Sequence, residues 1–158
     1  MSNATRRQLP VSDELAVWRA YVETFDAVRA RVESRLQQDT QLSTGDYKVL
    51  LALSEADGKA LRSSELAARI EWERSRLSGQ LGRMDKRGLV RRESCEEDAR
   101  GSRVVLSDEG ERAFRTSTVP HFRAIKELFV DAFTPQQLAQ LSEITTTMRH
   151  HLGLDDRQ

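Results

Sequence analysis

The stretch that decides the fold runs from Arg62 to Leu106 and reads RSSELAARIEWERSRLSGQLGRMDKRGLVRRESCEEDARGSRVVL. Its apolar spacing predicts a short helix over residues 64–70, capped by Ser63, followed by a turn. A second helix is expected from about Trp72 to Arg87, where Gly88 ends it. The runs at residues 89–94 and 103–106 then predict a β-hairpin.

This order of helix, turn, helix and hairpin is that of a winged helix-turn-helix, a module that places one helix in a DNA groove. In the second helix the four-and-three spacing of Leu77, Leu81 and Met84 marks the buried face. The opposite side then carries Ser75, Gly79, Gly82 and Lys86, with Arg76 and Arg83 together on one flank. Each exposed glycine lowers the stability of the helix by about 1 kcal/mol relative to alanine. Close approach of the helix backbone to a groove wall would offset this loss. The alternative is a merely solvated helix face, and the surrounding element order argues against it.

The hairpin loop, residues 95–102, carries Arg100 beside Gly101, which permits a tight turn. A narrow minor groove attracts an inserted arginine, and Asp98 could hold its guanidinium by a bidentate pair. Because Glu96 and Glu97 would repel phosphate, contact with DNA is expected through Arg100 and Arg103. A solvated hairpin tip remains the alternative.

Composition and charge limit the remaining possibilities. The chain has 158 residues, 38% hydrophobic and 32% charged, which predicts one helical, soluble domain. Its net charge is zero, so the total says nothing about nucleic acid. Between Arg62 and Arg103, however, basic residues exceed acidic ones by three, and a basic centre on an acidic scaffold points to a polyanion.

Long helical patterns flank this central region. Residues 11–37 hold a narrow apolar stripe behind Ser12 and Asp13 as caps, and residues 107–152 hold further helices. Ser43 and Asp46 resemble a capping box, residues 60–62 suit an edge strand, and Ser107 and Thr134 are expected caps. Pro120 predicts a kink or restart near Thr118. The predicted fold is mainly α with a small β-wing, in one domain: residues 43–106 form the head, and 11–37 and 107–152 serve as dimerisation helices.

Other chemistry is not indicated. The single cysteine, Cys95, allows no intramolecular disulfide, and no His, Cys, Asp or Glu set has metal spacing. No catalytic constellation appears, so neither an enzyme nor a cofactor is expected. No signal peptide or membrane span is evident, and a cytoplasmic location is predicted.

Three segments resemble the MarR family of winged-helix transcriptional regulators: SSELAARI, RSRLSGQLGRMDKRGLVRR and DARGSRVVLSDEG. The last follows the family pattern D-x-R…V-x-L-T/S-x-x-G. Two positions depart from the family: Glu71 stands where the turn often has Gly or Asn, and Glu73 replaces the usual Ser/Thr cap. These departures blur the expected start of the second helix by a residue or two.

The resemblance implies a homodimer with interleaved terminal helices and two heads on successive major grooves of double-stranded DNA. It assigns Asp98 and Arg100 to the wing, and Ser63 and Ser64 to phosphate contacts at a helix N-terminus. The groove-facing region becomes Ser75, Arg76, Ser78, Gly79 and Arg83.

Members of the family commonly repress, and they release DNA when a small phenolic or anionic ligand binds between head and scaffold. The candidates for such a crevice are Trp18, Arg19, Tyr21, Phe25 and Tyr47, although aromatic residues at such positions are more often core. The leading hypothesis is a repressor on a pseudo-palindromic operator. The alternatives are a winged-helix protein-interaction module and a thiol-based redox sensor through Cys95, for which an ordinary thiol is the simpler interpretation.

Overall fold

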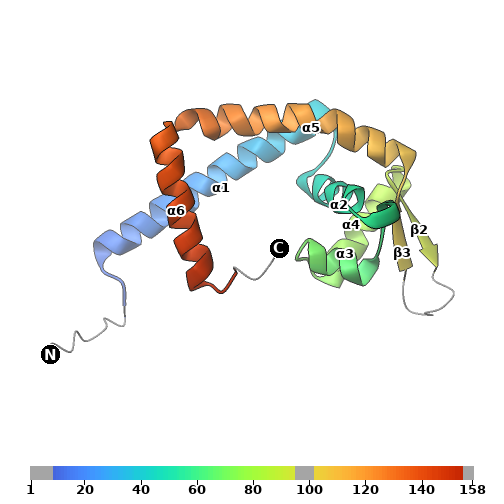
Figure 1. Cartoon of the computed structure of the whole chain (residues 1–158), viewed down its shortest axis with the longest axis horizontal. Coiled ribbons are helices and arrows are strands. Elements are labelled where there is room, and N and C mark those ends of the chain that lie inside the picture. Colours follow the sequence, from blue (N-terminus) through green and yellow to red (C-terminus); the bar gives the residue numbers. More distant parts are fainter. Residues whose placement is uncertain (1–8, 95–101, 155–158) are drawn as a thin grey trace.

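The computed structural model describes residues 9–94 and 102–154 of the chain. Figure 1 shows a head and a scaffold of long helices that extends away from it. The elements in chain order are α1 (Ser12–Thr40), α2 (Thr44–Ser54), η1 (Asp57–Lys59), β1 (Ala60–Arg62), α3 (Ser63–Arg69), α4 (Arg74–Lys86), β2 (Val90–Ser94), β3 (Ser102–Leu106), α5 (Asp108–Leu128), η2 (Val130–Ala132) and α6 (Pro135–His151). The predicted fold, mainly helical with a small sheet, is confirmed.

The head contains the hydrophobic core. The helices α2, α3 and α4 pack with a three-stranded antiparallel sheet of order β1-β3-β2. Leu50, Leu66 and Val104 are fully buried, as are Leu53, Leu77, Leu81, Met84 and Val90. The predicted edge strand is β1, and the predicted hairpin pairs Val90 with Leu106 and Ser94 with Ser102. The expected inner face of α4, formed by Leu77, Leu81 and Met84, is thus confirmed.

The scaffold helices bury little in the single chain. Figure 1 shows α5 along the top of the molecule, α1 rising from the lower left to meet it, and α6 turned downward at the far end of α5; α1 and α5 pack against each other. Leu36 is the one buried residue of α1, and α6 has none. Exposed apolar side chains on the scaffold include Leu15, Val17, Trp18, Tyr21, Val119, Phe122, Ile144, Met148 and Leu152. Apolar surface of this extent is typical of a face that packs against another surface.

Three of the expected helix caps are present. Ser43 accepts a hydrogen bond from the Asp46 N–H, while Asp46 accepts from the Ser43 N–H. Ser107 accepts from the N–H of Gly110, and Thr134 exchanges bonds with Gln137.

The predicted caps of two other helices are wrong. Ser12 and Asp13 lie inside α1, whose cap position is Val11 with its N–H donating to Glu14 Oε2 at 2.8 Å. The helix also continues to Thr40, three residues beyond the expected 37, and ends where Gln41 turns left-handed at φ 61°. Ser63 lies inside α3, because the strand pair β1–β3 draws its hydroxyl to Ser102, at 2.9 Å from the carbonyl oxygen.

The expected interruption at Pro120 is also wrong, because α5 is one continuous helix from Asp108 to Leu128. In a helix interior proline removes one backbone hydrogen bond, and its ring crowds the carbonyl of residue i−4, at a cost of about 3 kcal/mol. The contacts of α5 with α1 and α2 hold the helix together across that position.

The junction between head and α5 depends on a close backbone approach at Gly110. This buried glycine lies against the Leu89 carbonyl, and a Cβ placed on it would come within 2.0 Å of the Leu89 oxygen. The adjoining Ser107 N–H donates to the same oxygen at 3.3 Å, and the Ser107 hydroxyl donates to the Gly88 carbonyl at 2.5 Å. A side chain at position 110 would therefore push α5 away from the start of β2.

We predict that Gly110→Ala lowers the free energy of unfolding by about 3 kcal/mol, the upper end for a residue forced into a filled core. Gly82→Ala is the matched control, because a Cβ at Gly82 on α4 meets nothing within 4 Å. That control should raise stability by about 1 kcal/mol, since alanine is the better helix former. Urea unfolding followed by circular dichroism measures both, and a Gly110→Ala variant as stable as the parent would contradict the close approach.

Candidate nucleic-acid interface

The helix α4 presents the predicted polar face to solvent. Ser75, Arg76, Ser78, Gly79 and Arg83 are all exposed. Leu77, Leu81 and Met84 hold the opposite face in the core, together with Gln80. The helix begins at Arg74, two residues after the predicted start, with Glu73 as a cap residue whose side chain makes no capping bond. Two arginines, two serines and a glycine on one helix suit both phosphate oxygens and base edges.

The turn before α4 explains the later start. Glu71 adopts a left-handed conformation at φ 57°, directly after Ile70, the C-cap residue of α3. The N–H groups of Glu71 and Trp72 donate to the carbonyls of Ala68 and Ala67, a Schellman motif in which glycine usually holds the Glu71 position. The departure at Glu71 therefore leaves the turn geometry intact, and the backbone carries the strain of a non-glycine residue.

Arg76 is oriented by an aromatic ring. Its guanidinium carbon lies 4.0 Å from the centroid of the Trp72 indole, a cation–π contact. Trp72 is itself fitted against the start of α2, where a Cβ on Gly45 would lie 2.9 Å from the ring. The first turn of α4 is thereby tied to α2 through Trp72.

A polar cluster that the sequence analysis missed lies under the other end of α4. The Asp46 carboxylate, 1% exposed, accepts from Gln80 Nε2 at 2.7 Å and from Arg87 Nη1 at 2.7 Å. Gln80 Oε1 accepts from Arg83 Nη2 at 2.6 Å, and Arg87 Nη2 donates to the Gln41 carbonyl at 2.7 Å. The signal was available, because Gln80 is a polar residue inside the apolar spacing of α4.

The two serines proposed for phosphate differ in their surroundings. Ser64 is exposed at the start of α3. Ser63 is partly buried, and its hydroxyl lies 2.7 Å from the Ser102 hydroxyl as well as bonding the Ser102 carbonyl. Ser63 therefore joins α3 to the base of the hairpin.

The hairpin is attached to α4 by an arginine. Arg92 on β2 donates to the Ser78 carbonyl at 2.9 Å, so the strand and the helix keep a fixed relation. Arg103 is exposed on β3, as proposed. Asp98, Arg100 and Cys95 lie outside the described residues.

The five residues proposed for a ligand crevice do not come together in one chain. Trp18, Tyr21 and Phe25 follow each other along α1, with ring centroids 6.4 and 4.9 Å apart. Trp18 and Arg19 line an open hollow of about 290 Å³ with Leu15, Val22 and Glu23. Tyr47 lies elsewhere, buried on α2.

The Tyr47 ring packs against Phe114 and His121 of α5, with centroids 5.3 and 4.5 Å away. Burial raises the pKa of the Tyr47 hydroxyl, and burial lowers the pKa of His121. The His121 Nδ1 is buried without a hydrogen-bond partner among the described residues. This cluster therefore favours a neutral histidine between head and scaffold.

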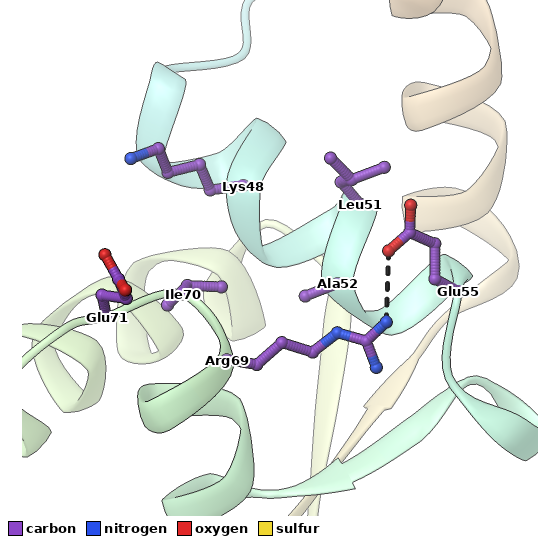
Figure 2. A pocket seen from close by; sticks show the side chains of 7 residues that line it. All are labelled: Lys48, Leu51, Ala52, Glu55, Arg69, Ile70 and Glu71. Atoms are coloured by element: carbon purple, nitrogen blue, oxygen red, sulfur yellow. Dashed lines mark hydrogen bonds and ion pairs between the residues drawn. The ribbon is translucent and has the colours of Figure 1, made fainter. Parts of the chain in front are cut away.

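A second hollow of about 290 Å³ opens where α2 meets the end of α3 (Figure 2). Its apolar lining comes from Leu51, Ala52 and Ile70, and an ion pair between Arg69 and Glu55, 3.2 Å apart, lies beside it. None of the residues proposed for DNA or ligand binding lines it.

Residues 9–94 and 102–154 hold no group of three or more His, Cys, Asp or Glu side chains arranged for a metal ion. In the same part of the chain, none of the helices combines the length and apolar character that crossing a bilayer requires.

Comparison with known proteins places this geometry in a family. A model of the MarR family matches residues 40–101, which span the head from α2 into the hairpin. No curated protein sequence matches the chain.

Solved structures match the whole fold. Sco3205, a MarR family transcriptional regulator from Streptomyces coelicolor solved in complex with DNA, is 34% identical, covers 92% of each chain and superposes with a TM-score of 0.81. AbsC, a MarR family regulator from the same organism, is 32% identical with a TM-score of 0.79, over 92% of this chain and 98% of its own. The organohalide-sensing regulator RdhR-CbdbA1625, solved with bound 2,4-dichlorophenol, is 21% identical with a TM-score of 0.77 over 96% of this chain and 89% of its own, and shares the fold.

Three observations point to the same family: the sequence motifs, the winged head with its exposed arginine helix, and the two relatives above 30% identity. The chain belongs to the MarR family of DNA-binding transcriptional regulators.

Proposed function

We propose that the chain acts as a homodimeric, sequence-specific repressor that binds a pseudo-palindromic operator and leaves it when a small ligand binds. The observation that carries this proposal is the exposed face of α4, on which Arg76 and Arg83 flank Ser75 and Gly79. A solved relative with the same fold was crystallised with DNA. In this proposal α4 enters the major groove, and Ser64 and the hairpin arginines, Arg100 and Arg103, contact the DNA on either side.

The uncovered apolar surface supports the homodimer. On α6 and its C-cap residue, Ile144, Met148 and Leu152 repeat every four residues and are 63%, 52% and 59% exposed. On α1 and α5, Trp18, Val119 and Phe122 are more than half exposed as well. A second copy related by a two-fold axis would cover such a surface with the same residues. It would also present two heads, as a pseudo-palindromic operator with half-sites about 34–36 Å apart requires.

The proposed effector is a small phenolic or anionic molecule. Support comes from the aromatic series along α1 and from the hollow that Trp18 and Arg19 both line, which offers an aromatic side chain and a cation. A second copy packed on α1 would close this open hollow. The bound 2,4-dichlorophenol of RdhR-CbdbA1625 is a property of that protein, and it makes chlorinated phenols a sensible first set to test.

The deciding experiment is selection of genomic fragments by the purified protein, followed by affinity measurements over a range of salt. Each neutralised phosphate should contribute about −0.9 to the slope of log affinity against log salt. We expect one enriched, two-fold symmetric sequence and a slope of several units. Enrichment of no fragment at low salt, or binding with no salt slope, would favour the protein-interaction module instead.

The wing assignment predicts that Arg100→Ala weakens operator binding roughly tenfold, the effect of about 1.4 kcal/mol of lost contact. The dimer should be unchanged, because the assigned role of Arg100 is on the DNA. Fluorescence anisotropy gives the affinity and analytical ultracentrifugation gives the mass. Loss of the dimer with undiminished affinity per dimer would show that the residue had been misassigned.

The dimer surface predicts that Ile144→Glu shifts the protein towards monomer at micromolar concentration, since it places a charge in an apolar interface. Ser142→Glu is the matched control, because this exposed residue lies on the other side of α6. Sedimentation equilibrium measures both variants. Equal masses for Ile144→Glu and the parent would remove α6 from the proposed interface.

A further inference from the structure

Arg83 is held from within the protein by two hydrogen bonds in series that start at a buried carboxylate. Gln80 Nε2 donates to Asp46 Oδ1 at 2.7 Å, and Arg83 Nη2 donates to Gln80 Oε1 at 2.6 Å. Asp46 and Gln80 are 1% and 7% exposed, whereas Arg83 is exposed. We call this set the Asp46–Gln80–Arg83 relay.

The direction of the Gln80 amide is fixed by its two neighbours. A carboxylate only accepts hydrogen bonds and a guanidinium only donates them. The NH₂ group of Gln80 must therefore face Asp46, and its oxygen must face Arg83. The reverse orientation would set donor against donor at Arg83 and acceptor against acceptor at Asp46.

The other carboxylate oxygen is already engaged. Asp46 Oδ2 accepts from the Ser43 N–H at 2.9 Å and from Arg87 Nη1 at 2.7 Å. Arg87 is in turn held by the Gln41 carbonyl. Asp46 is thus held by donors at the start of α2 and on and just after α4, and its Oδ1 is directed at Gln80.

The place of Arg83 on α4 indicates what it contacts. It lies on the flank of the exposed face, seven residues from Arg76, and not along the centre formed by Ser75 and Gly79. When a helix lies in the major groove, its flanks face the groove walls, which are the phosphate backbones. A guanidinium has five N–H donors, so one bond to Gln80 leaves donors for a phosphate oxygen.

We propose that Asp46 and Gln80 are positioning residues for DNA binding, and that the relay presets the Arg83 guanidinium for an operator phosphate. This inference rests on the proposed function. A long side chain that is already oriented loses less freedom on binding than a mobile one, so the relay raises affinity without touching DNA itself. Asp46 thereby joins the binding machinery as a buried residue on a different helix.

The test is a double-mutant cycle on operator affinity with Gln80→Met and Arg83→Ala. Methionine keeps the length of glutamine and removes both hydrogen bonds. We expect Arg83→Ala to weaken binding roughly tenfold and to reduce the salt slope by about one. Gln80→Met alone should weaken binding about fivefold, and in the Arg83→Ala background it should cause no further loss.

Two further variants separate positioning from stability. Asp46→Asn should behave like Gln80→Met in the cycle. The NH₂ group of the asparagine can donate to the Gln80 oxygen, so Gln80 can turn its own NH₂ group towards Arg83 and lose the bond to it. Arg87→Met removes a different partner of Asp46, so it loosens the same cluster but leaves the relay in place. Its effect on affinity should add in full to that of Arg83→Ala, and thermal unfolding shows the folded fraction of every variant.

Full additivity of Gln80→Met with Arg83→Ala would overturn the inference, as would unchanged operator affinity of Gln80→Met. A loss in Arg83→Ala that is confined to one base pair would place the arginine on a base edge and overturn the phosphate assignment. If the parent protein binds no fragment, the proposed function fails together with the inference. If the parent binds and the cycle shows no coupling, the inference alone fails.

Discussion

The buried carboxylate of Asp46 is the constraint on which the geometry of the head depends. A charge with 1% exposure is tolerable only where donors surround it, and here the Ser43 N–H, Gln80 and Arg87 supply them. Because these donors come from the start of α2 and from α4, the two helices cannot slide relative to each other without leaving the charge unpaired. Arg87 extends the constraint to α1 through the Gln41 carbonyl. The orientation of α4 is therefore specified by polar geometry as well as by the apolar core.

Other contacts support the first half of α4 by different chemistry. At its start, the Trp72 ring carries Arg76 and fits against Gly45 of α2. On its far side, Arg92 of β2 reaches the Ser78 carbonyl, and Ser63 connects α3 with the hairpin base. A helix that enters a groove needs such support, because a small tilt displaces every side chain that it presents. The scaffold helices have the opposite character, with α6 burying none of its residues in the single chain.

The order and type of the elements could be predicted because local signals carry them. Leu77, Leu81 and Met84 identified the inner face of α4, and Thr134 with Pro135 identified the start of α6. Two of the misses arose where tertiary contacts override local rules. Ser63 is a good capping residue by type, but strand pairing directs its hydroxyl to Ser102. Pro120 should break a helix, yet packing carries α5 through it. Asp46 was recognised as part of a capping box. The polar Gln80 within the apolar spacing of α4 signalled a buried polar group, but nothing local shows that its partner is Asp46, 34 residues away, or that Asp46 also binds Arg87, 41 residues away.

The close approach at Gly110 has a consequence for building chimeric regulators. A cut between head and scaffold suggests itself at Leu106, where the last strand ends. The Ser107 N–H, however, donates to the Leu89 carbonyl, and the Ser107 hydroxyl donates to the Gly88 carbonyl. Gly110 leaves the space that the Leu89 carbonyl occupies. A transplanted head must therefore include the first turn of α5. At its other end it must include Gln41, because the Gln41 carbonyl accepts the hydrogen bond from Arg87. The exchangeable unit of this protein is longer than its winged helix by a few residues on each side.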